Sequence, residues 1–470
     1  MNRRLLLVFA LCAPAAGLAM PVAPRAFCAK YPTAPACTGV QLACSYCHSS
    51  PPGRNTFGAV IEAQLLPGTP RPLTEAVFEA ALPNALAAVE SNDSDGDGVT
   101  NLVEIQRGTL PAEKKSYPND IPCAGGTNPR YDVCKYDTRY VYKKVLLDFC
   151  GAQPTWEQLE TFLAAADKPA AIDAALDGCL QSEFWRGKNG QLWEIAHKKI
   201  RPVGSLKRGE DQVPGTIFPI FDYYADYAMF TYTQLDNRDA REVLTAKYLV
   251  QRTAGARTTY AQVQNIFQEN CPTNRRAGLL TTNWNLGYNV MFTALPRNAA
   301  SQAYRSFLGL DIAKQEGLYP ISSEPRDFDG KGVQQDLCKQ CHQTLDPLSY
   351  PWKNYNGLTG DFQEWGSYLP NRITRFFAGE APNIGMIPES GYILGQPVSD
   401  LVQWARVAAD SDPFAINTVM DYWKLTMGGP PTPEQNAEFV KLWRDFKGPL
   451  NYGVDNMLHA LVKTEAYGAP

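Results

Sequence analysis

The sequence predicts a mainly α-helical protein, and the prediction depends on helical periodicity, helix capping and composition. Leu159, Phe162 and Leu163 recur at the spacing of one buried helix face. Thr155 and Gln158 stand just before and inside that stretch at the spacing of a capping box. The chain has 470 residues, of which 44% are hydrophobic, so it is long enough for two to four domains with cores of their own.

Residues 1–19 have the order of a secretory signal peptide. Arg3 and Arg4 precede an apolar run, and small residues lead up to Ala19, where we expect cleavage. Removal of this segment takes the formal charge from −4 to −6. A retained anchor is the alternative, but the apolar run is shorter than the ~20 residues that span a bilayer. We therefore expect an extracytoplasmic, for example periplasmic, protein without a transmembrane span in the mature chain.

The strongest signal in the sequence is a Cys-x-x-Cys-His motif that occurs twice. Two thiols at this spacing bind the vinyl groups of haem, and the imidazole that follows ligates the iron. A zinc site would need four clustered ligands, and the chain has only four histidines. A thioredoxin-like redox pair leaves the trailing histidine unexplained. We expect two covalently bound haem c groups, attached at Cys44, Cys47 and His48 and at Cys338, Cys341 and His342.

The sixth iron ligands are less clearly marked. Met386 follows the second motif by 44 residues and stands beside a proline, a setting that presents a thioether to haem iron; filling a loop core is the alternative. No histidine lies between His48 and His197. A ligand to the first haem therefore comes from a distant segment, with His197 and His459 as candidates, or the site is open or taken by another side chain.

Between the motifs, residues 93–104 have the spacing of a calcium-binding loop. Oxygen donors fall at loop positions 1, 3, 5, 9 and 12, and Gly98 falls at position 6, where the backbone turns sharply. The pattern resembles the single Asp-rich repeats of thrombospondin type 3 more than a paired EF-hand, and an acidic solvated turn is the alternative. The expected Ca²⁺ ligands are Asp93, Asp95, Asp97, the Val99 carbonyl, Asn101 and Glu104.

The other cysteines indicate disulfides, as an oxidising compartment allows. The closest neighbours in sequence are Cys28 with Cys37, Cys123 with Cys134, and Cys150 with Cys179, and Cys271 is left over. The balance of 44 basic and 48 acidic residues argues against nucleic acid as a partner.

The order of these signals predicts four parts after the signal peptide. Residues 20–125 form a first haem domain with the calcium loop, with helices at 55–66 and 73–90. Residues 126–271 form a helical domain, 272–375 a second haem domain, and 376–470 a C-terminal helical domain.

The second half resembles a known family. Residues 276–281 read Arg-Ala-Gly-Leu-Leu-Thr, and Asp346-Pro347 follows the second motif. Both features are similar to the planctomycete-type cytochrome c proteins, also frequent in myxobacteria, although Leu345 is an extra residue before the Asp-Pro step. Residues 413–467 resemble the closing helical domain of that family, and 154–200 more loosely a helical domain upstream. The resemblance implies an exported, mainly helical haem protein and leaves the reaction open.

Three functions compete on this basis. The first is electron transfer between extracytoplasmic redox partner proteins. The second is a di-haem peroxidase-like or oxygenase-like oxidoreductase in which one haem is open. The third is a binding module in which the middle helical block docks a partner. Haem is the only evident source of reactivity in the sequence, and the oligomeric state is not encoded in any pattern we recognise.

Overall fold

The computed structural model describes residues 20, 22–37, 42–50, 53–114, 116, 136–200, 223–266, 270–432 and 435–469. In these ranges the secondary structure consists of helices and three two-stranded antiparallel hairpins, so the predicted mainly α class is confirmed. The expected signal peptide and the expected disulfide between Cys123 and Cys134 lie outside the described residues. Among the helices described, none is long and apolar enough to cross a membrane.

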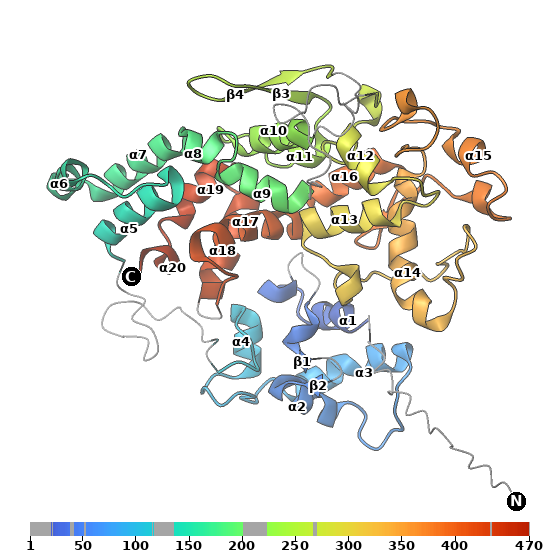
Figure 1. Ribbon diagram of the computed structural model, residues 1–470. Helices are drawn as coiled ribbons and strands as arrows, with labels where there is room; N and C mark the ends of the chain where they lie inside the picture. The colour runs from blue at the N-terminus through green and yellow to red at the C-terminus, as the bar shows by residue number, and fades with distance from the viewer. Residues whose placement is uncertain are drawn as a thin grey trace, which may run out of the picture.

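The N-terminal part has a small core of its own, and Figure 1 shows it in blue beneath the larger helical body. Phe27, Tyr46 and Phe57 meet edge to face at its centre, with ring centroids 5.4 and 5.9 Å apart. Helix α3 packs against α1 and α2, and the expected disulfide between Cys28 and Cys37 is confirmed. The elements are α1 (Ala23–Lys30), β1 (His48–Ser50), β2 (Gly53–Arg54), α2 (Thr56–Gln64), α3 (Glu75–Ala88) and α4 (Asn101–Arg107).

The middle of the chain is helical, as its periodicity predicts. The capping box of Thr155 and Gln158 is formed in both directions at the start of α6. The expected disulfide between Cys150 and Cys179 is also confirmed, and it joins the end of the first helical segment to α7. The elements are α5 (Thr138–Val145), a π-helical turn η3 (Leu146–Cys150), α6 (Trp156–Ala164), α7 (Lys168–Leu180), α8 (Glu183–Arg186), α9 (Gln191–Ile200), α10 (Tyr223–Gln234), α11 (Glu242–Thr245), β3 (Leu249–Thr253) and β4 (Thr259–Val263).

The second half adds helices and one more hairpin. Helix α13 packs against α14, which carries the second Cys-x-x-Cys-His motif, and against α17. The elements are α12 (Asn283–Asn289), α13 (Arg297–Leu308), α14 (Asp336–Ser349), α15 (Arg372–Phe376), β5 (Gly391–Ile393), β6 (Gln396–Val398), α16 (Leu401–Asp410), α17 (Asp412–Met427), α18 (Asn436–Lys447), α19 (Val454–Leu461) and α20 (Glu465–Gly468).

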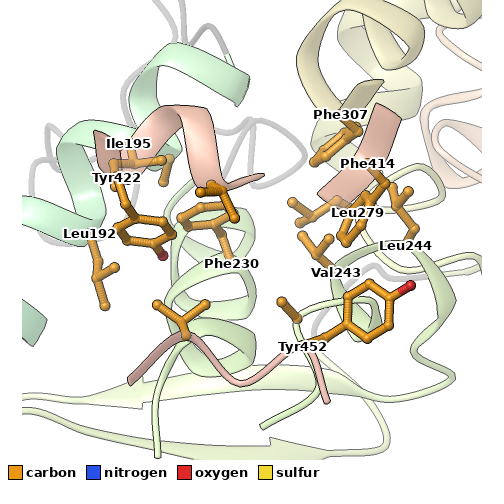
Figure 2. Packing of buried hydrophobic residues seen from close by; sticks show 14 of the residues in the cluster. Leu192, Ile195, Phe230, Val243, Leu244, Leu279, Phe307, Phe414, Tyr422 and Tyr452 are labelled. Carbon is orange, nitrogen blue, oxygen red and sulfur yellow. The ribbon is translucent and has the colours of Figure 1, made fainter. Parts of the chain in front are cut away.

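One buried hydrophobic cluster connects the middle and the second half. It runs from Val141 to Tyr467, and Figure 2 shows Leu192 of α9, Phe230 of α10 and Tyr422 of α17 converging in it. The C-terminal helix α20 is bonded to the π-helical turn η3, since the Tyr467 hydroxyl donates to Asp148 Oδ2 at 3.0 Å. Buried residues on both sides of the proposed boundaries at 271/272 and 375/376 belong to this one cluster, and the four-part division stays a prediction.

Candidate functional site

The first motif begins with a short 3-10 helix, η2 (Cys44–Tyr46), and is bonded to the start of α2. Asn55 caps α2 by accepting from the Gly58 amide at 2.8 Å. The same side chain donates to the carbonyls of Ser45 and Tyr46 at 3.2 and 3.0 Å, which ties the motif backbone to the helix. A Cβ at Gly58 would lie 1.9 Å from the Cys47 carbonyl oxygen, so only glycine allows this approach.

His48 stands at the first pair of the hairpin that follows, opposite Arg54. Its Nδ1 lies 3.2 Å from the Gly53 carbonyl oxygen and 3.4 Å from an Arg54 guanidinium nitrogen. The two contacts require different tautomers: Nδ1 must be protonated to bond the Gly53 carbonyl and unprotonated to accept from Arg54. The tautomer that bonds Gly53, the shorter contact, leaves the Nε2 lone pair for a metal. Metal-ligating histidines commonly donate their second ring nitrogen to such an acceptor, so the geometry of His48 fits proximal ligation.

The second motif is built differently, entirely within α14. Cys338, Cys341 and His342 lie three and four residues apart on this helix, which places them on one face. Leu337, next to Cys338 in the sequence, is a largely exposed apolar residue of this helix.

The His342 imidazole is bonded to a buried carboxylate one helical turn further along. Its Nδ1 lies 2.7 Å from Asp346 Oδ1, and Asp346 is fully buried. Arg297 donates to both oxygens of Asp346, at 2.6 and 2.9 Å, and to both oxygens of Asp329, at 2.6 and 3.1 Å. We call His342, Asp346, Arg297 and Asp329 the His342 network.

The thiols of both motifs are suited to haem attachment. Disulfides form elsewhere in the described chain, whereas the motif cysteines are not joined in one. Burial, opposed in part by Arg54, raises the pKa of Cys47 to about 12, and burial followed by the charge of Cys338 raises the pKa of Cys341. Cysteines that form no disulfide and histidines bonded at Nδ1 are present at both motifs, and these residues fit a covalently bound haem with histidine as one axial ligand.

One segment of the chain runs between the surroundings of the two motifs. Burial and then the charge of Glu316 raise the pKa of Cys44, so Glu316 lies near the first motif. Five residues later the Ile321 amide donates to the Gln343 carbonyl at 3.2 Å, next to His342. Five extended residues span at most about 18 Å. The segment 316–321 thus connects the surroundings of one motif with those of the other.

The three candidate sixth ligands lie in unlike surroundings. Met386, on η10 (Ile384–Met386), is 68% exposed. The Nδ1 of His197 on α9 lies 2.8 Å from the Tyr227 hydroxyl. His459 on α19 has Nδ1 3.0 Å from Asp173 and Nε2 2.9 Å from Asp177. Since both of its ring nitrogens face carboxylates of α7, His459 is arranged as an ion pair between helices, an arrangement that competes with iron ligation.

The loop at residues 93–104 gathers carboxylates around one point. Ligand atoms of Asp93, Asp95 and Asp97 lie within 4.8 Å of one another. Asp93 accepts from the amides of Gly96 and Gly98 at 2.7 and 2.8 Å, which sets the sharp turn that the glycines predict. The Asn101 side chain accepts from the Ser94 amide at 3.3 Å and donates to the Val89 carbonyl at 2.8 Å. Asn101 therefore closes the loop through its own amide.

Several oxygens around this point are buried without a donor among the described residues. They are Asp95 Oδ2, Asp97 Oδ2 and Glu104 Oε2, and Glu104 is fully buried. Burial, then Asp95 and Asp97, raise the pKa of Glu104 to about 8; burial and then Asp97 raise the pKa of Asp95 to about 6. Buried carboxylates of this kind need a countercharge, and the hard oxygen donor set fits a Ca²⁺ ion.

Comparison with family models, curated proteins and solved structures finds no match for this chain. The resemblance of the second half to planctomycete-type cytochromes therefore depends on its motif residues and stays a prediction.

Sequence reasoning missed the residues that orient the two histidines. Asp346 was noted only as part of the Asp-Pro step, although its spacing of four residues from His342 on a helix is a signal for contact. Arg297 and Asp329 lie 49 and 17 residues before Asp346, and Arg54 lies across a hairpin from His48. No local pattern marks these partners, because their contacts form only when the helices and strands pack.

Proposed function

We propose that the chain is an exported di-haem c-type cytochrome that transfers electrons between extracytoplasmic partners. The observation that carries the proposal is the state of the motif histidines: each is held at Nδ1 by an acceptor, and each follows two cysteines that form no disulfide. The haem would supply one-electron chemistry. Cys44 and Cys47, and Cys338 and Cys341, would hold the two haems covalently.

The protein residues have positioning roles in this proposal. Gly53 and Asp346 would orient the proximal imidazoles and fix their tautomers. The disulfides of the described chain support export, because such bonds persist in oxidising compartments. The order of residues 1–19 is the sequence signal for the same location.

We propose in addition that the loop at 93–104 binds one Ca²⁺ ion as a structural part of the N-terminal unit. Asp93, Asp95, Asp97 and Glu104 would supply carboxylate oxygens, and Val99 its carbonyl. The unpartnered buried oxygens of this loop support the proposal. A single site of this kind in an oxidising compartment acts as a staple, since ordering the loop by a cation stabilises the folded state.

The alternative is a di-haem peroxidase-like or oxygenase-like oxidoreductase with one open haem. One observation favours it: both histidines outside the motifs are engaged by other side chains, His459 by two carboxylates and His197 by Tyr227. If neither ligates iron, Met386 is the remaining candidate from the sequence, and it can serve at most one haem.

The test is to purify the mature protein, count haems by pyridine haemochrome and mass spectrometry, and record the low-temperature EPR spectrum of the oxidised form. Two covalent haems with only low-spin signals would support electron transfer. A stoichiometric high-spin signal would favour the oxidoreductase, and a peroxide titration would follow. Cys338→Ala with Cys341→Ala should lose one of the two haems, whereas Cys271→Ala should lose none. A chain without covalent haem would refute the proposal.

A further inference from the structure

The two proximal histidines have different electrostatic surroundings. His342 donates to the carboxylate of Asp346, while His48 faces a backbone carbonyl and the guanidinium of Arg54, which is itself paired with Glu62 at 2.8 Å. A carboxylate acceptor makes an imidazole a stronger electron donor to its metal than a carbonyl does. The sites would therefore differ on the histidine side of the iron, whatever the sixth ligands are.

The charges of the His342 network add up to an excess negative charge. Arg297 is cationic: burial lowers its pKa, but the hydrogen bonds that it donates to Asp346 and Asp329 outweigh burial and raise the pKa. Asp346 accepts from the Arg297 guanidinium on both of its oxygens. The two carboxylates outnumber the one guanidinium, and the side chains of Asp346 and Asp329 are only 0% and 10% exposed. This charge is weakly screened by solvent.

We propose that Asp346, held in place by Arg297 and Asp329, is a positioning residue for His342 and lowers the reduction potential of the second haem. The inference rests on the proposed attachment of haem at Cys338 and Cys341. A negative charge bonded to the proximal imidazole stabilises oxidised iron more than reduced iron, because oxidised iron carries one more positive charge. Arg297 fixes the Asp346 carboxylate at two atoms, which also fixes the His342 ring and its tautomer.

The experiment is spectroelectrochemical titration of the purified two-haem protein and of variants, with haem content and circular dichroism measured on each. Asp346→Asn removes the charge and keeps the shape, so the potential of one haem should rise and the other should stay unchanged. Asp346→Glu restores a carboxylate and should bring the potential part of the way back. A purely structural role for Asp346 would not produce that recovery in potential.

Two further variants keep the inference testable and assign the haems. Asp329→Asn leaves Asp346 in place but neutralises the network, so the same haem should shift upward by less, even if Asp346→Asn does not fold. Arg54→Gln removes the cation beside His48 and should lower the potential of the other haem. Asp336→Asn is the matched control, because Asp336 is an exposed carboxylate of the same helix, α14.

The outcomes separate this inference from the proposed function. If the protein carries two haems and neither Asp346→Asn nor Asp329→Asn raises a potential, the inference is wrong and the cytochrome proposal stands. It is also wrong if Asp336→Asn shifts the same haem as much as Asp346→Asn does, since charge alone would then explain the result. If no haem is attached at Cys338 and Cys341, both proposals fail.

Discussion

Replacement of Glu104 by glutamine should change the stability of the N-terminal unit in opposite directions with and without calcium. Burial, Asp95 and Asp97 raise the pKa of Glu104 from its ordinary 4.5 to about 8. At ~1.4 kcal/mol for each tenfold change in proton affinity, this corresponds to roughly 5 kcal/mol. Glu104 is buried, but Asp95 and Asp97 beside it are partly open to solvent, which screens their charges, so we expect about 2 kcal/mol.

The sign of the pH dependence follows from the raised pKa. Between pH 4.5 and about 8 the folded state without calcium holds a proton on Glu104 that the unfolded chain has released. Stability is therefore greatest below pH 4.5 and is lost as the pH rises through about 8. Calcium supplies the countercharge to ionised Glu104, so this loss should disappear when calcium is bound, and calcium should stabilise more at the higher pH.

In the wild type the Thr109 hydroxyl donates to Glu104 Oε1 at 3.3 Å. Glutamine has nearly the shape of glutamate and can still accept this hydrogen bond. Without calcium at about pH 8, Glu104→Gln should be more stable than wild type by about 2 kcal/mol, because the buried charge of Glu104 is removed. With calcium it should be less stable, because a ligand is lost. The assay is thermal unfolding by circular dichroism with calcium or with EGTA, and Glu160→Gln on the exposed face of α6 is the control.

The reasoning is refuted if calcium leaves the unfolding temperature of the wild type unchanged. It is also refuted if Glu104→Gln destabilises the protein equally in calcium and in EGTA, because a packing defect would then explain the result.

Three more predictions concern the helical body. Replacement of Cys150 and Cys179 by serine should lower the free energy of unfolding by about 2–4 kcal/mol, measured by denaturant titration. Trp404→Ala removes a fully buried ring that meets another tryptophan edge to face at 4.9 Å, and it should cost about 3–5 kcal/mol. His459→Gln should cost up to about 1 kcal/mol. Burial alone would raise the pKa of Asp173, but the hydrogen bonds that it accepts from His459 and Lys463 lower it below its ordinary 3.8. The stabilisation by these bonds is therefore present above pH 3.8 and is lost as the pH falls through the lowered pKa of Asp173 in the folded state.

Each of these predictions has its own contradicting result. The disulfide argument fails if the serine variant matches wild type under non-reducing conditions. A Trp404→Phe variant as damaged as Trp404→Ala would mean that volume at the site does not matter. If His459→Gln loses a haem or gains a high-spin signal while its stability is unchanged, His459 is an iron ligand and its ion pairs are secondary.

Sequence patterns predicted the local structure correctly where the interacting residues lie close together in the chain. The capping box at Thr155, helices at 56–64 and 75–88, and the disulfides of Cys28–Cys37 and Cys150–Cys179 are all present. The C-terminal stretch shows the limit. The sequence predicts a C-terminal helical domain over 376–470 without setting the number of its helices, and the structure has the β5–β6 hairpin and α16, α17, α18, α19 and α20 there. Short helices depend on tertiary packing for their stability, so the local sequence pattern does not predict how many of them form.

The sequence by itself supplied the motifs on which the proposed chemistry depends. Cysteine and histidine spacing, and the carboxylate spacing at 93–104, follow from covalent and coordination geometry within a few residues, so they can be recognised before folding. Only the tertiary structure decided which hydrogen-bond and ion-pair partners surround the motif and candidate ligand residues. Asp346 meets Arg297 across 49 residues, and His459 meets Asp173 across 286. Such contacts depend on which helices pack together, and that outcome is set by the whole hydrophobic core and not by any local stretch of sequence.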